Sequence, residues 1–89
     1  MMMKGELLED YVVVDDQTEG NRLYGKGNYG YPRRGGGVDL DLLESCLLVE
    51  LGKLELFEKG NRMSFEDIFR HSSTLIEDFD ILYIVYRDI

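Results

Sequence analysis

Two side chains in this sequence are common nucleophiles or bases in enzymes: Cys46 and His71, each the only residue of its type. A histidine that acts as a general base needs an orienting partner and a pocket. His71 follows Arg70 at the expected end of a short helix, where histidines commonly cap carbonyl groups. Cys46 lies within a leucine-rich helix, where a thiol behaves as a small apolar group. One cysteine and one histidine cannot form a Cys/His metal site, so we expect no catalytic, cofactor-binding or metal-binding residues.

The carboxylates gather in two short stretches, DLDLLE at 39–44 and IEDFD at 76–80. Paired acids of this kind could hold a metal or move a proton. Both stretches fall at expected helix starts, where acidic side chains cap backbone amides and favour the positive end of the helix dipole. We therefore interpret them as capping and solvent-exposed groups.

Glycines in YGKGNYG, at positions 25, 27 and 30, have the spacing G-x-G-x-x-G. A dinucleotide-binding loop needs a strand before it, a helix directly after it, and an acid about 20 residues further on. The residues that follow here are Tyr31, Pro32 and a triple-glycine loop, so the spacing alone does not predict nucleotide binding.

A basic and aromatic segment, residues 22–34, is the best candidate for a binding patch. Cations and aromatic rings together could contact RNA phosphates and bases. The same groups could dock an acidic loop of another subunit, or form a solvated hairpin with packed tyrosines. These three readings stay open. The candidate contact residues are Arg22, Lys26, Tyr29, Arg33 and Arg34.

Length and charge limit the function classes. With 89 residues, we expect one small domain over 1–89 with a modest core. Eighteen acidic residues against ten basic ones give a net charge of −8, which argues against RNA binding by bulk electrostatics. A single cysteine excludes an internal disulfide and fits a reducing, cytoplasmic setting. No signal-peptide pattern and no membrane-spanning run is visible, so no membrane association is expected.

Periodicity and turn residues predict strands in three places. The β-branched run from Val12 to Val14 marks a strand within 8–16, and 22–31 forms one glycine-loosened strand or two short ones. PRRGGG at 32–37 is a loop. A further short strand follows residue 53 and ends in a Gly60-Asn61 turn.

Three helices are predicted, each from a start signal. The first covers 38–53, with an Asp41/Glu44 capping box, Gly52 just past its end and enough leucines to be buried on two sides. The second begins at Ser64 and is broken by HSST at 71–74. The third begins at a Thr74/Glu77 capping box. The fold class is α+β: a small antiparallel or mixed sheet of short strands packed with about three helices.

The last helix carries a sustained apolar stripe and no stop signal before residue 89. It therefore reads as a helix that normally leads into something further. Its apolar and aromatic side chains are candidates for an interface that uses buried aromatics more than charge. These candidate interface residues are Leu75, Phe79, Leu82, Tyr83 and Tyr86.

Four stretches together resemble one family: RLYGKGNYGYP, VDLDLLESCLLVELGKLELF, GNRMSFEDIFRHSS and FDILYIVYRDI. In that order and spacing they are similar to the N-terminal domain of archaeal tRNA-splicing endonucleases. The resemblance covers roughly residues 22–89. Its pattern includes an LY-x-x-G-x-YG stretch, a helix ending in GKLE, an SFEE-type helix and a YxVYRD helix that leads into a catalytic domain.

The resemblance implies a role in RNA processing. The family cuts precursor tRNA at bulge-helix-bulge introns without metal, leaving a cyclic phosphate, and it uses Tyr, His and Lys residues of a C-terminal domain. This sequence stops before that domain, so no catalytic position carries over. His71 does not match the catalytic histidine, and Lys53 in GKLE is a scaffold position.

The expectation is therefore a non-catalytic N-terminal domain or subunit, either a fragment or a separately encoded front half, that should be inactive alone. Its expected partners are a catalytic endonuclease domain or subunit in an oligomer, and precursor tRNA through that assembly. The alternative from another class is a standalone acidic interaction module that binds a basic protein and has no RNA role.

Overall fold

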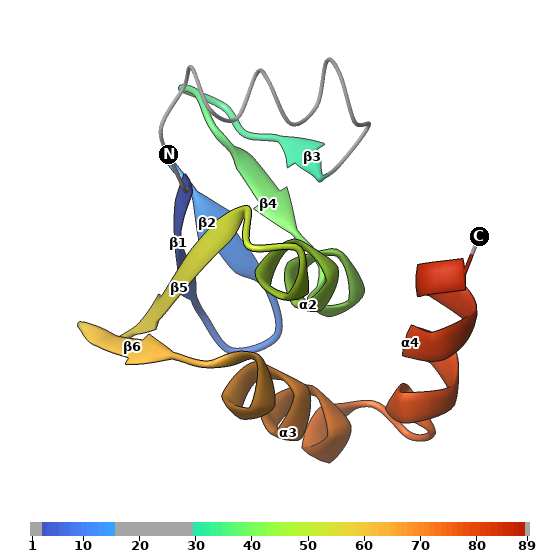
Figure 1. Cartoon of the computed structure of the whole chain (residues 1–89). Helices are drawn as coiled ribbons and strands as arrows, with labels where there is room; N and C mark the ends of the chain where they lie inside the picture. Colours follow the sequence, from blue (N-terminus) through green and yellow to red (C-terminus); the bar gives the residue numbers. More distant parts are fainter. Residues whose placement is uncertain (1–2, 16–29, 89) are drawn as a thin grey trace.

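The computed structural model describes residues 3–15 and 30–88, which form a mixed sheet with helices on one side (Figure 1). This confirms the α+β prediction. The strands are β1 (Met3–Leu7), β2 (Val12–Val14), β3 (Tyr31–Pro32), β4 (Val38–Leu40), β5 (Leu54–Glu58) and β6 (Asn61–Met63). The helices are α2 (Leu42–Glu50), α3 (Phe65–Leu75) and α4 (Phe79–Asp88).

The strand order in the sheet is β3-β4-β2-β1-β5-β6. Neighbouring strands are antiparallel except β1 and β5, which run parallel with Met3 opposite Leu54 and Gly5 opposite Leu56. The first strand of the chain thus lies inside the sheet, between β2 and β5. The sequence-based prediction placed no strand at Met3–Leu7, because this five-residue stretch is short and its alternation of apolar and polar side chains includes a glycine.

Alternation along the central strands explains which face is buried. In β1, Met3, Gly5 and Leu7 are buried, whereas Lys4 and Glu6 are exposed. A Cβ at Gly5 would lie 2.8 Å from Val12 Cγ1, so only glycine lets the two strands pack this closely. The core joins this face of the sheet to the helices through Leu7, Val12, Val14, Val38, Leu40, Leu42, Cys46, Leu48, Leu54, Leu56, Ile68, Phe79 and Tyr83.

Helix α2 begins directly after the Asp41/Glu44 capping box, four residues later than the predicted start at residue 38. The Asp41 carboxylate accepts from the Glu44 amide at 2.7 Å, and Glu44 reaches back to the Asp41 amide at 3.1 Å. The predicted start at 38 is wrong, because Val38–Leu40 pairs with β2 as a strand whose two apolar side chains are both buried. At the other end, Gly52 (φ +73°) is the predicted left-handed residue past the helix.

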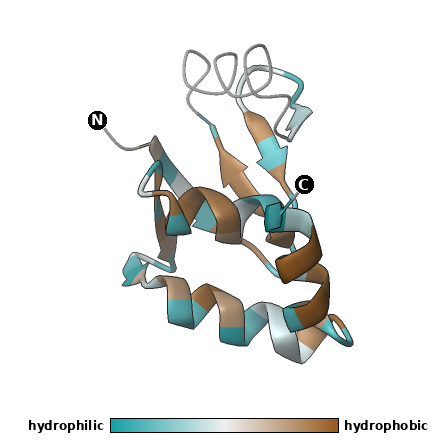
Figure 2. Ribbon diagram, turned by 45° about the vertical axis from the view of Figure 1, so that its right-hand side comes forward, coloured by the Kyte–Doolittle hydropathy of each residue, from teal (hydrophilic) through white to brown (hydrophobic). Residues whose placement is uncertain are grey.

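Helix α2 is the middle layer of the packing. It contacts the sheet through β5 on one side and α3 and α4 on the other (Figures 1 and 2). This confirms the expected burial on two sides. Cys46 is fully buried there, with its Sγ 4.0 Å from the Ser72 hydroxyl of α3.

Helix α3 begins at the predicted Ser64/Asp67 capping box but does not end at HSST. Hydroxyls in that stretch bond back to the carbonyls of the preceding turn, Ser72 to Ile68 at 2.8 Å and Ser73 to Phe69 at 2.8 Å. These polar side chains are thereby satisfied within the helix, which continues to Leu75. The predicted break at 71–74 is therefore wrong.

The last helix begins later than predicted. Ile76 caps α3 in an extended conformation, and Asp78 adopts a left-handed conformation (φ +58°) before α4 starts at Phe79. Thr74 lies inside α3, so the Thr74/Glu77 capping box does not form. The prediction also missed β6, which completes a hairpin with β5 around the turn at Lys59 and Gly60.

Two further predictions concern the strands of residues 22–31 and membrane-spanning segments. The predicted strand or strands of 22–31 lie mostly outside the described residues, and Tyr31 belongs to β3. Within residues 3–15 and 30–88, no helix has the length and apolar character needed to cross a membrane.

The Ser64 cap offers a test of how α3 is held. Ser64→Ala removes the acceptor for the Asp67 amide (3.1 Å) and should lower the free energy of unfolding by about 1 kcal/mol. Ser73→Ala, at an exposed serine on the same helix, is the matched control and should change stability by less than about 0.5 kcal/mol. Urea unfolding followed by circular dichroism measures both. Equal losses would contradict the capping role.

Candidate functional site

The outer face of α4 is the most distinctive surface of the described residues. Ile81, Leu82, Ile84 and Val85 have exposed fractions of 58, 45, 55 and 56 %. Figure 2 shows this helix in strongly hydrophobic colours at the edge of the molecule. Contiguous exposed apolar side chains of this kind mark interaction surfaces in soluble proteins. We call these four residues the α4 outer face.

The inner face of α4 packs through two aromatic rings. Phe79 and Tyr83, one turn apart, are 1 % and 3 % exposed. Phe79 contacts Phe69 of α3 edge-on with ring centroids 5.4 Å apart, and Tyr83 lies between Phe65 and Phe69 at 5.8 Å from each. This aromatic cluster joins α4 to α3.

A carboxylate at the end of α2 makes the polar contact with α4. Glu50 accepts a short hydrogen bond from the Tyr83 hydroxyl through one oxygen and a bond from Arg87 Nη1 at 2.9 Å through the other. Burial, with the adjacent Glu50 carboxylate as a further cause, raises the pKa of the Tyr83 phenol. Tyr83 therefore stays a neutral donor to Glu50.

Of the predicted basic patch, only Arg33 and Arg34 lie among the described residues. Arg33 forms a short ion pair with Asp39 of β4, and Arg34 is exposed at the following turn. The contact role of this patch stays a prediction. Arg22, Lys26 and Tyr29 lie outside residues 3–15 and 30–88.

Glu44 links the segment before β3 to helix α2. Besides capping Asp41, its second oxygen accepts from the Gly30 amide at 2.8 Å. Burial raises the pKa of Glu44, and the two backbone amides that bond to it act in the opposite direction. The carboxylate therefore serves two backbone donors and is not free for chemistry.

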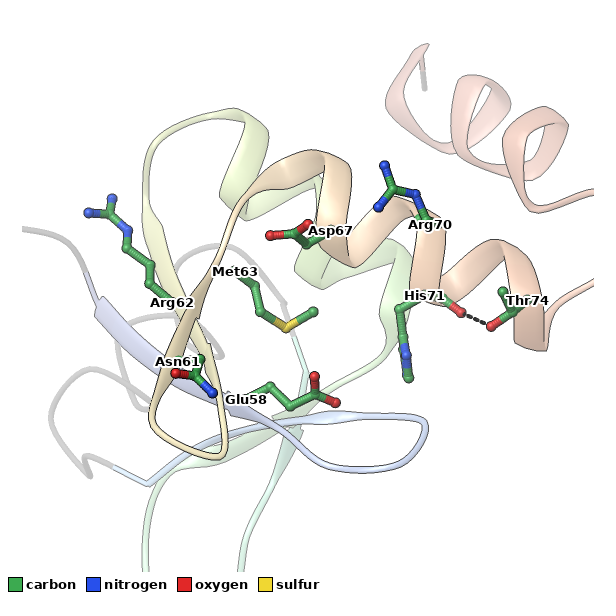
Figure 3. A pocket seen from close by; sticks show the side chains of 8 residues that line it. All are labelled: Glu58, Asn61, Arg62, Met63, Asp67, Arg70, His71 and Thr74. Atoms are coloured by element: carbon green, nitrogen blue, oxygen red, sulfur yellow. Dashed lines mark hydrogen bonds between the residues drawn. The ribbon is translucent and has the colours of Figure 1, made fainter.

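A cleft of about 430 Å³ lies between the β5–β6 hairpin and α3 (Figure 3). His71 lines it, but its Nε2 donates to the Glu9 carbonyl oxygen at 3.0 Å, which ties α3 to the β1–β2 turn. Acidic and basic groups share the cleft, so it offers no net charge to an ion. Its lining is Glu58, Asn61, Arg62, Met63, Asp67, Arg70, His71 and Thr74.

The predicted interface residues divide between core and surface. Phe79 and Tyr83 are buried against the chain's own helices, Tyr86 is half-buried, and Leu75 and Leu82 are exposed at 48 and 45 %. Their role as an interface stays a prediction. The sequence reasoning missed Ile81, Ile84 and Val85, although ILYIVY is apolar on every side of a helix, which is a signal of double-sided burial.

Neither candidate reactive group is placed for chemistry. The Cys46 thiol is fully buried, and His71 is engaged with a backbone carbonyl. Within the part of the chain that the structure describes, no three His, Cys, Asp or Glu side chains are close enough to hold a metal ion.

Comparison with known sequences identifies a family and several relatives. The family described as "tRNA intron endonuclease, N-terminal domain" matches residues 3–69. Among curated proteins, the tRNA-splicing endonuclease of Hyperthermus butylicus is 40% identical over an alignment of 98 residues that covers 99% of this chain and 54% of that protein. The tRNA-splicing endonuclease of Methanococcoides burtonii is 36% identical over 87 residues, 98% of this chain and 24% of that protein.

A third relative, the tRNA-splicing endonuclease of Pyrococcus abyssi, is 38% identical over 69 residues, 78% of this chain and 40% of that protein. The chain therefore spans between about a quarter and about half the length of these relatives.

The burial of Cys46 predicts an inert thiol. Burial raises its pKa from the ordinary 9.0 to about 12, so at pH 8 its thiolate fraction should be roughly a thousandfold below that of an exposed cysteine. An aromatic disulfide that releases a coloured thiolate on reaction should modify Cys46 slowly in buffer. The same reaction in concentrated urea, where the chain is unfolded, is the control and should be rapid. Fast reaction of the folded chain would show that the thiol is accessible.

Proposed function

The chain belongs to the family of tRNA intron endonuclease N-terminal domains, and from this we propose that it is a non-catalytic domain or subunit of a tRNA-splicing endonuclease. Its task is to support the assembly that removes introns from precursor tRNA at bulge-helix-bulge sites. Its direct partner is a catalytic endonuclease domain or subunit, and it meets precursor tRNA through that complex in an oligomer. The setting is the cytoplasm, where the single thiol stays reduced.

The observation that carries this proposal is the α4 outer face. A ten-residue helix with four large apolar side chains about half exposed is stabilised when a partner covers them. Relatives in which the matching region is 24% and 54% of the protein have further chain that could supply the covering surface. We propose that the catalytic half covers the α4 outer face.

The reactive groups support the non-catalytic part of the proposal. The Cys46 thiol is protonated and buried, and the His71 imidazole is held by the Glu9 carbonyl. Neither is paired with a second group as nucleophile and base. The net charge of −8 also favours an architectural role over direct binding of RNA phosphates.

The alternative, an acidic module that binds a basic protein, receives less support. The exposed surface that most needs a partner is apolar, and its neighbours on α4 include Arg87 as well as Asp80 and Asp88. A basic partner would gain little from covering it.

A reconstitution tests the proposal. The chain is mixed with a separately expressed catalytic half of a related tRNA-splicing endonuclease, and cleavage of a labelled bulge-helix-bulge RNA is followed. We expect cleavage from the mixture and none from this chain alone. If the two neither bind nor cut, the scaffold function is wrong.

Surface substitutions locate the contact. Leu82→Asp places a charge at the edge of the α4 outer face and should weaken binding to the catalytic half by at least about tenfold, because the charge would be desolvated without a partner. Leu8→Asp, at a leucine of similar exposure (38 %) beside the β1–β2 turn, is the matched control and should bind normally. Calorimetric titration measures both. Equal binding by all three proteins would exclude this face.

A further inference from the structure

Glu50 occupies a position that is unfavourable for an acid. It is the last residue of α2, where the helix dipole is negative, and the last turn of α2 holds no basic residue to offset it. Its carboxylate is nevertheless fully engaged, because both oxygens accept hydrogen bonds from α4. The contact with α4 therefore accounts for an acid at this site.

The two donors are arranged to fix a direction. Tyr83 and Arg87 are four residues apart, so they lie on the same face of α4 on successive turns. Two bonds from one carboxylate to two turns of a helix restrict both its rotation and its tilt. A single bond would leave the helix free to pivot. We call this three-residue contact the Glu50 clamp.

The buried and the half-buried residues of α4 are divided along the helix, with Tyr86 half-buried in its second half. Only Phe79 and Tyr83 of this helix are buried, and both lie in its first five residues. The turn that leads into α4 is short, with Glu77 and Asp78 exposed. Figure 1 shows α4 at the margin of the molecule. The aromatic cluster thus packs the first half of α4, where Tyr83 also bonds to Glu50, and Arg87 extends the clamp to the second half.

We propose that Glu50 is a positioning residue, which sets the direction of α4 so that the α4 outer face meets its partner in one orientation. This inference rests on the proposed function as far as the partner is concerned. The positioning itself is a property of this chain and can be measured without a partner.

The first experiment measures the direction of α4 in the free chain. Spin labels at Asn61→Cys on β6 and Asp88→Cys at the end of α4 span the molecule, and buried Cys46 stays unlabelled. Pulsed electron resonance should give one narrow distance distribution in the parent chain. Glu50→Ala should broaden it about twofold or more, since the helix loses both of its charge-assisted contacts.

A second variant guards against general unfolding. Tyr83→Phe/Arg87→Met removes both donors but keeps the buried ring and the aliphatic stem, so the aromatic cluster stays packed. It should broaden the distribution as Glu50→Ala does while circular dichroism stays at the parent value. An unchanged distribution in this folded variant would overturn the inference.

A charge exchange separates positioning from simple loss of stability. Arg87→Glu sets two carboxylates against each other, whereas Glu50→Lys/Arg87→Glu restores an opposite pair with the charges reversed. We expect Arg87→Glu to broaden the distribution and to weaken binding of the catalytic half about fivefold, and the exchange to recover most of both. Absence of any recovery would count against the clamp.

The two proposals can fail separately. If the parent chain does not bind a catalytic half, the proposed function fails, and the free-chain distances still decide whether Glu50 directs α4. If binding is tight and sensitive to Leu82→Asp but the Glu50 variants show parent distances and parent affinity, the proposed function holds and the positioning role is wrong.

Discussion

The double burial of α2 is the constraint on which the rest of this structure depends. A chain of 89 residues has little apolar surface to bury, and here one helix serves two interfaces. Leu42, Cys46 and Leu48 are all almost completely buried, and α2 contacts β5 on one side and α3 and α4 on the other. Helix α2 thus joins the sheet to the helix pair, in addition to the contact of α3 with β6 and the bond from His71 to the Glu9 carbonyl. The small size of Ser45 and Ser72, both fully buried, lets the layers approach closely.

Two of the three predicted capping boxes mark observed helix starts, and the Thr74/Glu77 box does not form. The Asp41/Glu44 and Ser64/Asp67 capping boxes both form, because each depends only on residues three apart and on an extended N-cap residue. Gly52 ends α2 for an equally local reason. The prediction failed where pairing decided the outcome. The residues that follow Val38–Leu40 in the sequence favour a helix, but Val38–Leu40 is a strand because it pairs with β2.

Other errors share a cause. Met3–Leu7 lies as a strand between β2 and β5, and no local pattern reports a partner such as β5, which is about fifty residues away. The HSST stretch has low helix propensity, yet its hydroxyls find carbonyl acceptors within the helix. For the candidate surface, the sequence indicated the last helix but not which of its sides is exposed. That depends on Phe79 and Tyr83 meeting the rings of α3, which is a tertiary contact.

The parallel pairing of β1 with β5 has a consequence for how the chain acquires its structure. The sheet cannot be completed until residues 54–57 are available to pair with residues 3–6, so its closing contact is long-range and slow to form. On a ribosome, β1 must wait without β5, one of its two neighbours, while the more than forty residues between Leu7 and Leu54 emerge. The α3 and α4 contacts come last and enclose fewer side chains. Opening of the folded chain should therefore begin at α4 and reach the β1–β5 pair only when the whole molecule unfolds.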